Sequence, residues 1–106
     1  MIIYRFTGLS EYFKGCGMMH IDPVADSNKT KLLKHANQHV KHLTEANKAF
    51  NLGVQKLHVR SMDQELAVKL FSTEDVEELV EKREWIKRWE YQHDPSIKED
   101  KGDDDE

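Results

Sequence analysis

The chain has 106 residues, of which 38% are hydrophobic and 34% are charged, and its net charge is −4. This length is typical of one domain, and the low apolar content predicts a small core. The single cysteine excludes an internal disulfide and favours a reducing compartment, and no apolar run is long enough for a signal peptide or a membrane span. We therefore expect a soluble cytoplasmic protein that has no membrane partner.

The charge is distributed unevenly along the chain. Residues 1–60 carry a net charge of +5 and five of the six histidines, whereas residues 61–106 carry −9. Such an asymmetry is typical of proteins that bind partners, or whose two halves contact each other. It identifies no reaction.

The N-terminal segment has the pattern of a half-buried strand, because Ile2, Tyr4 and Phe6 alternate with other side chains within residues 1–7. Residues 8–27 contain three glycines and a proline. This segment is predicted to be mostly loop, with one helical turn at residues 11–13.

Residues 28–50 have the clearest helical pattern in the chain. Their apolar residues fall within a stripe about 80° wide, and most of their lysines lie on the far side. Ser27 or Asn28 can cap the start of the helix, and Gly53 is the expected stop signal. The pattern predicts an amphipathic, basic helix.

Residues 54–71 allow two interpretations. Two runs of alternating apolar residues, around 57–59 and 66–70, favour a β-hairpin. The good helix formers among residues 62–71 favour a helix for that part instead. We predict the hairpin.

Residues 73–91 are predicted to form the second helix. Ser72 and Asp75 have the spacing of a capping box. Acidic residues come before basic ones, which is the order that the helix dipole favours, and pairs such as Glu78 and Lys82 are four residues apart.

These elements give the order β-α-β-β-α in a single domain, residues 1–94. The expected fold class is α+β, with a small sheet covered on one side by two helices, and the alternative is an all-α bundle in which 62–71 is helical. The acidic composition of residues 95–106 predicts a disordered tail, because it offers too little apolar surface to bury.

Two tryptophans indicate a binding surface most clearly. On the predicted second helix, Trp85 projects about 100° away from the apolar stripe, and Trp89 lies beside it one turn later. Lys82 and Arg88 flank this pair. Aromatic and basic side chains are enriched at interface centres, so these four residues are predicted to bind a partner protein or a second copy of the chain. Burial of both rings under the N-terminal segment is the other interpretation.

The basic N-terminal half is a second candidate surface, because lysine and arginine neutralise phosphates in nucleic acids. The candidate residues for this alternative are Arg5, Lys31, Lys34, Lys41, Lys48, Lys56, Arg60 and Lys69. The expected sheet face lacks aromatic residues on which bases could stack, and the chain as a whole is acidic. Both features weaken the nucleic-acid interpretation.

Three histidines, His35, His39 and His42, follow one another on one arc of the first predicted helix. Two of them could share a transition metal, but the arc supplies no further ligand, so we expect neither a metal nor another cofactor. Their protonation on acidification would make this helix more cationic.

The sequence contains no catalytic triad, phosphate-binding loop or carboxylate pair, and Cys16 has no evident base. We expect a small non-catalytic binding or regulatory protein that acts through protein–protein contact, such as an adaptor, an inhibitor or a viral-type accessory factor. The alternative is a nucleic-acid-binding protein that uses the basic half. An enzyme that uses a histidine-bound metal or the thiol is the third interpretation.

Overall fold

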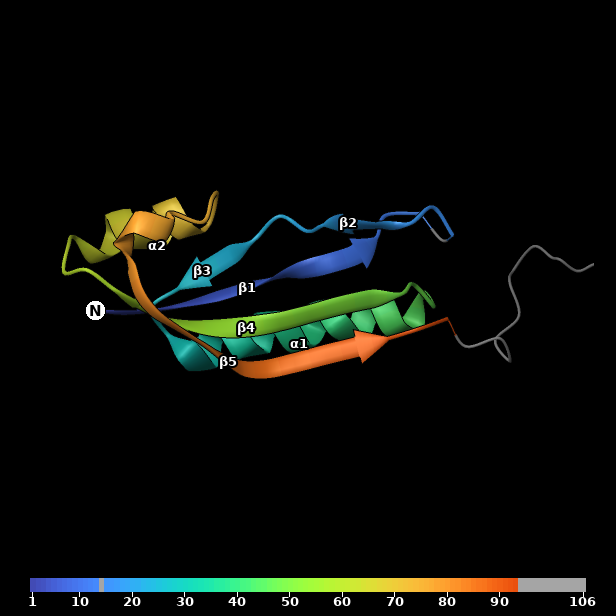
Figure 1. Ribbon diagram of the computed structural model, residues 1–106. Coiled ribbons are helices and arrows are strands. Elements are labelled where there is room, and N and C mark those ends of the chain that lie inside the picture. Colours follow the sequence, from blue (N-terminus) through green and yellow to red (C-terminus); the bar gives the residue numbers. More distant parts are fainter. Residues whose placement is uncertain (14, 94–106) are drawn as a thin grey trace, which may run out of the picture.

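A sheet of five antiparallel strands forms the centre of the fold (Figure 1). The computed structural model describes residues 1–13 and 15–93. The strands are β1 (Ile2–Glu11), β2 (Met18–His20), β3 (Val24–Asp26), β4 (Phe50–Val59) and β5 (Val80–Tyr91). The helices are α1 (Lys29–Glu45), α2 (Gln64–Phe71) and the 3₁₀ turn η1 (Glu77–Leu79). The α+β class expected from the sequence is confirmed.

The two longest pairings join strands that are distant in the sequence. β1 lies between β4 and the two short strands, and β4 lies between β1 and β5, in the order β2-β1-β4-β5 with β3 paired to the other half of β1. The β1–β4 register runs without interruption from Ile2 opposite His58 to Ser10 opposite Phe50. β5 is therefore an edge strand of the described sheet.

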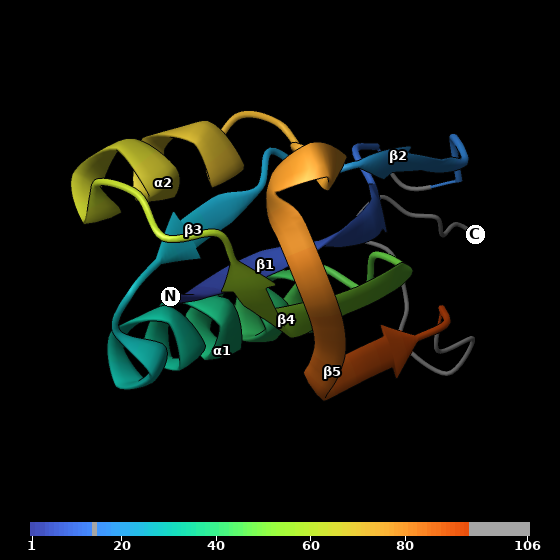
Figure 2. The ribbon, with the colours of Figure 1, turned by 60° about the vertical axis from the view of Figure 1, so that its left-hand side comes forward.

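The two helices cover opposite faces of the sheet, as Figure 2 shows, and not one face as the sequence analysis predicted. Because side chains alternate along a strand, Ile3 and Phe6 of β1 point to different faces. Ile3 packs in one buried cluster with α2, and Phe6 packs in the other with α1. We call these the α2 face and the α1 face.

The first cluster, on the α2 face, buries Ile3, Ala25, Leu57, Val59, Ala67 and Phe71. The second cluster, on the α1 face, buries Phe6, Leu32, Ala36, Phe50, Leu52 and Val54. Each helix therefore contributes its own apolar stripe to its own side of the sheet.

The predictions for β1 and α1 are confirmed in kind and corrected in extent. β1 continues to Glu11, because Gly8 adopts φ +142° within the strand and lets it pass close to β4. The side chain of Asn28 caps α1 by accepting a hydrogen bond from the Lys31 amide at 3.0 Å. α1 ends at Glu45, and Gly53 is not a helix stop but lies inside β4.

Residues 8–27 contain more structure than the predicted loop, since β2 and β3 form within them and pair with β1. The predicted helical turn at residues 11–13 is absent.

The hairpin predicted for residues 54–71 is wrong in its second half, where the helical interpretation of 62–71 is correct. α2 begins after Asp63, whose carboxylate accepts a hydrogen bond from the Leu66 amide at 3.0 Å. Ala67 and Phe71, four residues apart, are both fully buried against the sheet. Capping and burial of one helical face outweigh the alternation of the apolar residues.

The second helix predicted for residues 73–91 is wrong, because this segment forms η1 and the long strand β5. The predicted capping box does not form. Ser72 ends α2 and donates a hydrogen bond to the Val68 carbonyl, while Asp75 binds Arg83 at 2.6 Å. Pairing with β4 along its whole length stabilises the extended conformation despite the helical signals.

The predicted acidic tail, residues 95–106, lies outside the described residues. Among the residues that the structure describes, none of the helices has the length and apolar character needed to cross a membrane.

Candidate protein-binding surface

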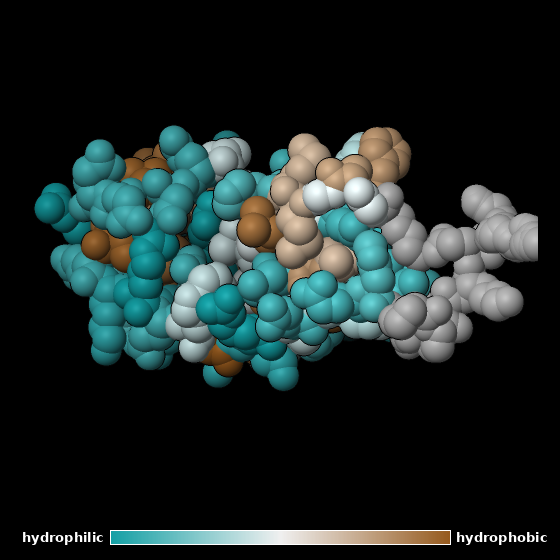
Figure 3. Space-filling view, turned by 45° about the vertical axis from the view of Figure 1, so that its right-hand side comes forward, coloured by the Kyte–Doolittle hydropathy of each residue, from teal (hydrophilic) through white to brown (hydrophobic). Residues whose placement is uncertain are grey.

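The turn between β1 and β2 exposes large apolar side chains. Tyr12 and Phe13 are 66% and 68% exposed, and Met18 and Met19 are 39% and 57% exposed. The rings of Tyr12 and Phe13 pack edge to face, with centroids 4.8 Å apart. We call these four residues the hairpin surface; Figure 3 shows brown, apolar side chains gathered at this end of the molecule. Exposed apolar groups that lie together mark interaction sites on soluble proteins.

A groove of about 710 Å³ lies between the hairpin and the C-terminal half of α1. Its apolar lining comes from Tyr12, Phe13, Met19, Ile21 and Leu43. Its polar lining comes from Ser10, Glu11, His20, Asp22, His39 and Lys48. Five of the eleven lining residues are apolar and six are polar, so a partner segment can make both kinds of contact there.

The buried carboxylate of Glu11 anchors the hairpin through hydrogen bonds. Its side chain is only 5% exposed, and its carboxylate accepts hydrogen bonds from the amides of Ala49 at 2.8 Å and Gly15 at 2.7 Å. Nε2 of His93 lies 2.6 Å from the same carboxylate. Glu11 therefore connects the β1–β2 turn, the loop before β4 and the end of β5.

The hydrogen bonds decide the ionisation of Glu11. Burial on its own raises the pKa of this carboxyl, but the Ala49 amide, His93 and the Gly15 amide together lower it below its ordinary value of 4.5. The carboxylate is thus ionised at neutral pH. A charged acceptor holds its donors more strongly than a neutral one.

Two further bonds fix the turn itself. The Phe13 amide donates to Sγ of Cys16 at 3.3 Å, and Nζ of Lys48 donates to the Tyr12 carbonyl at 2.9 Å. Cys16 is exposed. Its sulfur accepts this backbone hydrogen bond and its thiol donates to the Gly17 carbonyl at 3.6 Å, and among the residues that the structure describes no side-chain base is bonded to it.

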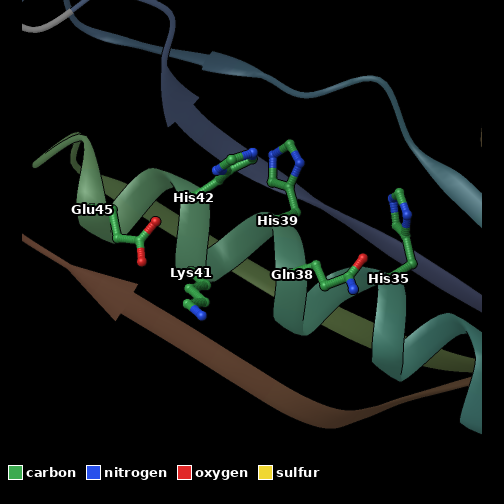
Figure 4. A pocket seen from close by; sticks show the side chains of 6 residues that line it. All are labelled: His35, Gln38, His39, Lys41, His42 and Glu45. Atoms are coloured by element: carbon green, nitrogen blue, oxygen red, sulfur yellow. The ribbon is translucent and has the colours of Figure 1, made fainter.

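The three histidines lie along the α1 side of a hollow of about 440 Å³. Figure 4 shows their rings pointing toward β1 and β2, and Lys41 pointing the other way. The rings of His35 and His39 have centroids 6.4 Å apart, and the Phe6 ring lies 5.5 Å from His39. Within the described part of the chain, no group of three or more His, Cys, Asp or Glu side chains is arranged to hold a metal ion.

His39 is the histidine whose ionisation is perturbed. Burial against the sheet lowers its pKa below the ordinary value of 6.5, and the neighbouring His35 and His42 lower it further. A neutral His39 therefore borders both the hollow and the groove at pH 7.

The four predicted partner-binding residues, Lys82, Trp85, Arg88 and Trp89, all lie on β5. The two tryptophans do not form one ridge, because the strand points them to opposite faces. Trp89 packs on the α1 face, edge to face with Phe6 at 6.0 Å, and is partly buried. Trp85 lies over Gly53 on the α2 face and is 44% exposed, with the Arg88 guanidinium 4.4 Å from its ring centre.

The structure does not bring the eight predicted nucleic-acid-binding residues onto one surface. Lys31, Lys34 and Lys41 are exposed on α1, while Lys48 borders the groove. Arg5 is only 7% exposed on the α2 face, and its Nε donates to the Phe71 carbonyl at 2.9 Å.

The remaining three of the eight lie elsewhere. Lys56 belongs to β4, opposite Glu84 of β5; Arg60 follows the end of β4; and Lys69 belongs to α2. The predicted basic sheet face is therefore absent, because α2 covers its centre and β5 brings acidic residues beside it.

No family model, no curated protein and no solved structure matched this chain.

The hairpin surface was missed by reasoning from the sequence. Its residues lie in a glycine-rich segment, which predicts a loop and says nothing of exposure. The available signal was the presence of four large apolar residues, at 12, 13, 18 and 19, around a turn built on Gly15 and Gly17. A turn of this kind cannot bury apolar side chains on both sides of itself.

Proposed function

We propose that this protein is a non-catalytic binding protein that contacts another protein through the hairpin surface and the groove beside it. The observation that supports this proposal is the concentration of exposed apolar groups. Of the six exposed large hydrophobic residues in the described chain, four lie between Tyr12 and Met19. Exposed aromatic and methionine side chains are enriched at interface cores.

The chemistry of the groove indicates what kind of segment binds there. Its lining accepts apolar side chains, and Lys48 borders it. Of the two acids in the lining, Glu11 and Asp22, Glu11 is already bonded to three donors. We therefore propose an amphipathic partner segment whose apolar side enters the groove.

A capture experiment tests this function with matched variants. The wild type, Phe13→Ala/Met19→Ala and the control Leu66→Ala are immobilised and exposed to lysate of the source organism, with and without nuclease. Leu66 is a suitable control because it is 49% exposed on α2, on the other face of the sheet. Loss of two interface anchors should weaken binding by at least about thirtyfold, which corresponds to about 2 kcal/mol.

The proposal requires that one protein is retained by the wild type and the control, is lost with the hairpin variant, and resists nuclease. Equal retention by all three forms would place the binding site elsewhere.

Nucleic-acid binding is the alternative function, and the exposed lysines of α1 favour it. Lys31, Lys34 and Lys41 are all exposed, and the first turn of the helix has no acidic residue. In that case retained material would be lost on nuclease treatment and with rising salt, and Lys34→Glu/Lys41→Glu would abolish it while Phe13→Ala/Met19→Ala would not.

A further inference from the structure

The outer edge of β5 is a second interaction surface, separate from the hairpin surface. β5 has twelve residues and pairs with β4 on its inner side only, within the part of the chain that is described. The outer edge therefore presents unpaired backbone N–H and C=O groups. An edge of this length is a template for pairing with another strand.

One extra residue in β5 decides which side chains share a face. The register with β4 shifts between Trp85, opposite Gln55, and Lys87, opposite Val54, so Ile86 has no opposite residue. After this bulge the alternation reverses. The α2 face of β5 carries Arg83, Trp85, Arg88 and Glu90, and the α1 face carries Lys82, Glu84, Trp89 and Tyr91.

We propose that β5 pairs antiparallel with β5 of a second copy of this chain, about a twofold axis between Ile86 and Lys87. Such a contact uses the same surface on both copies and closes after two subunits. The strand contains seven charged residues, so its charge pattern decides whether this pairing is favourable and in which register.

The pairing is complementary on both faces. On the α2 face, Trp85 lies opposite Arg88 of the partner subunit, and Arg83 lies opposite Glu90 of the partner subunit. On the α1 face, Lys82 lies opposite Tyr91 of the partner subunit. Each contact occurs twice by symmetry, and no like charges lie directly opposite each other, while the two copies of Lys87 lie side by side at the axis. Ion pairs and cation–π contacts between opposite residues stabilise a sheet, whereas like charges destabilise it.

Neighbouring registers lack this complementarity. With the axis on Lys87, two lysines face each other, and Glu84 and Glu90 of the partner subunit are opposite in register but lie on different faces of the sheet. With the axis between Trp85 and Ile86, Arg83 faces Arg88 of the partner subunit. With the axis on Ile86, Glu84 would meet Arg88 of the partner subunit, but these two side chains lie on different faces of the sheet. The charge pattern and the bulge therefore select one register.

Cysteine cross-linking tests the register directly in the full-length chain. Cys16 is the only native cysteine, so Cys16→Ser provides a background without thiols. Lys87→Cys places two thiols beside the twofold axis. Lys82→Cys, the matched control at another exposed lysine, places them about 30 Å apart along the paired strands, at roughly 3.3 Å per residue. Mild oxidation should give a covalent dimer with Lys87→Cys and none with Lys82→Cys.

Charge reversal gives the second, independent measurement. Glu90→Lys creates two like-charge contacts with Arg83 of the partner subunit, whereas Glu81→Lys makes the same charge change at the end of the strand, where it faces no cation. Sedimentation velocity should show a dimer for the wild type and for Glu81→Lys. The dimerisation affinity of Glu90→Lys should be at least about tenfold weaker. Circular dichroism checks that both variants fold.

Either of two results would overturn this inference. The first is a chain that stays monomeric at the highest concentration measured. The second is a dimer that forms without selective cross-linking at position 87. The hairpin variant Phe13→Ala/Met19→Ala should dimerise normally, so a failure of this inference and a failure of the proposed function are distinguishable.

Discussion

Replacement of Glu11 should destabilise the whole domain, because this one carboxylate serves three separate segments. In Glu11→Ala the amide of Ala49, a residue only 8% exposed, loses its acceptor. An unsatisfied buried donor costs about 1–3 kcal/mol, and the charged hydrogen bonds to Gly15 and His93 are lost as well, although water replaces part of them. We expect a loss of about 3 kcal/mol in the free energy of unfolding at pH 7.

The effect should also depend on pH. The pKa of Glu11 is lower in the folded state than in the unfolded chain, so its stabilisation is complete above the unfolded value of about 4.5 and is lost as the pH falls through the lower folded pKa. The difference between the wild type and Glu11→Gln should therefore be constant near neutral pH and shrink below pH 4.5. In that range the binding of one proton changes the slope of the free energy of unfolding against pH by up to about 1.4 kcal/mol per pH unit.

Urea denaturation between pH 7 and pH 3 measures both quantities, with Glu81→Gln as the control for an exposed acid on β5. A Glu11→Gln variant with wild-type stability and an unchanged pH slope would refute the reasoning. It would mean that the negative charge of Glu11 contributes nothing to folding.

Three further predictions follow from single positions. In denaturant melts, Trp89→Ala should lower the free energy of unfolding by about 3 kcal/mol and Trp85→Ala by at most about 1 kcal/mol, because only the Trp89 ring packs in a buried cluster. Equal losses for the two variants would contradict this assignment. Gly8→Ala should destabilise the fold by about 3 kcal/mol or more, since the new Cβ would overlap a backbone carbonyl of β4, whereas Gly15→Ala, which has open space around it, should cost about 1 kcal/mol. The lowered pKa of His39 means that protonation favours the unfolded chain, so stability should fall as the pH decreases below about 6.5. In melts between pH 7 and pH 5, His39→Gln should flatten this pH dependence, and an unchanged slope would contradict the prediction.

The elements with strong local signals were predictable from the sequence. The strand at residues 1–7 and the helix that starts after Asn28 each depend on one apolar side and a short-range signal. The α+β class followed from these two elements. The side of the sheet that each helix covers could not be predicted from the sequence. It depends on whether Ile3 or Phe6 faces a given helix, and both residues are apolar.

β5 was mistaken for a helix for two physical reasons. As an edge strand it has polar residues on both faces, so its alternation between apolar and polar residues is weak. The extra residue at Ile86 then reverses what alternation there is. The order of acidic and basic residues, which resembles that of a helix, serves contacts with other elements instead, such as the ion pair of Arg83 with Asp75 and the hydrogen bond of Glu84 with His58.

The candidate binding residues were predictable only in part. Trp85 lies outside both buried clusters, which is one of the two interpretations that the sequence left open, although the helical geometry used for it was wrong. The hairpin surface was not predicted, since the exposure of Phe13 and Met19 results from the pairing of β1 with β2 and from the bonds to Glu11.

The strand order has a consequence for how quickly the chain can fold. The pairing of β1 with β4 closes a loop that contains β2, β3 and the whole of α1, and β5 joins only after α2 has been passed. Sheets made of such distant pairings fold in milliseconds to seconds, because the entropy of loop closure must be overcome before the contacts form. During synthesis, β1 can pair only with β2 and β3 until residues 50–59 have left the ribosome, and Ile3 and Phe6 remain without their partners on β4 for that time. Translation speed over the α1 codons therefore sets how long an incomplete, apolar sheet is open to aggregation.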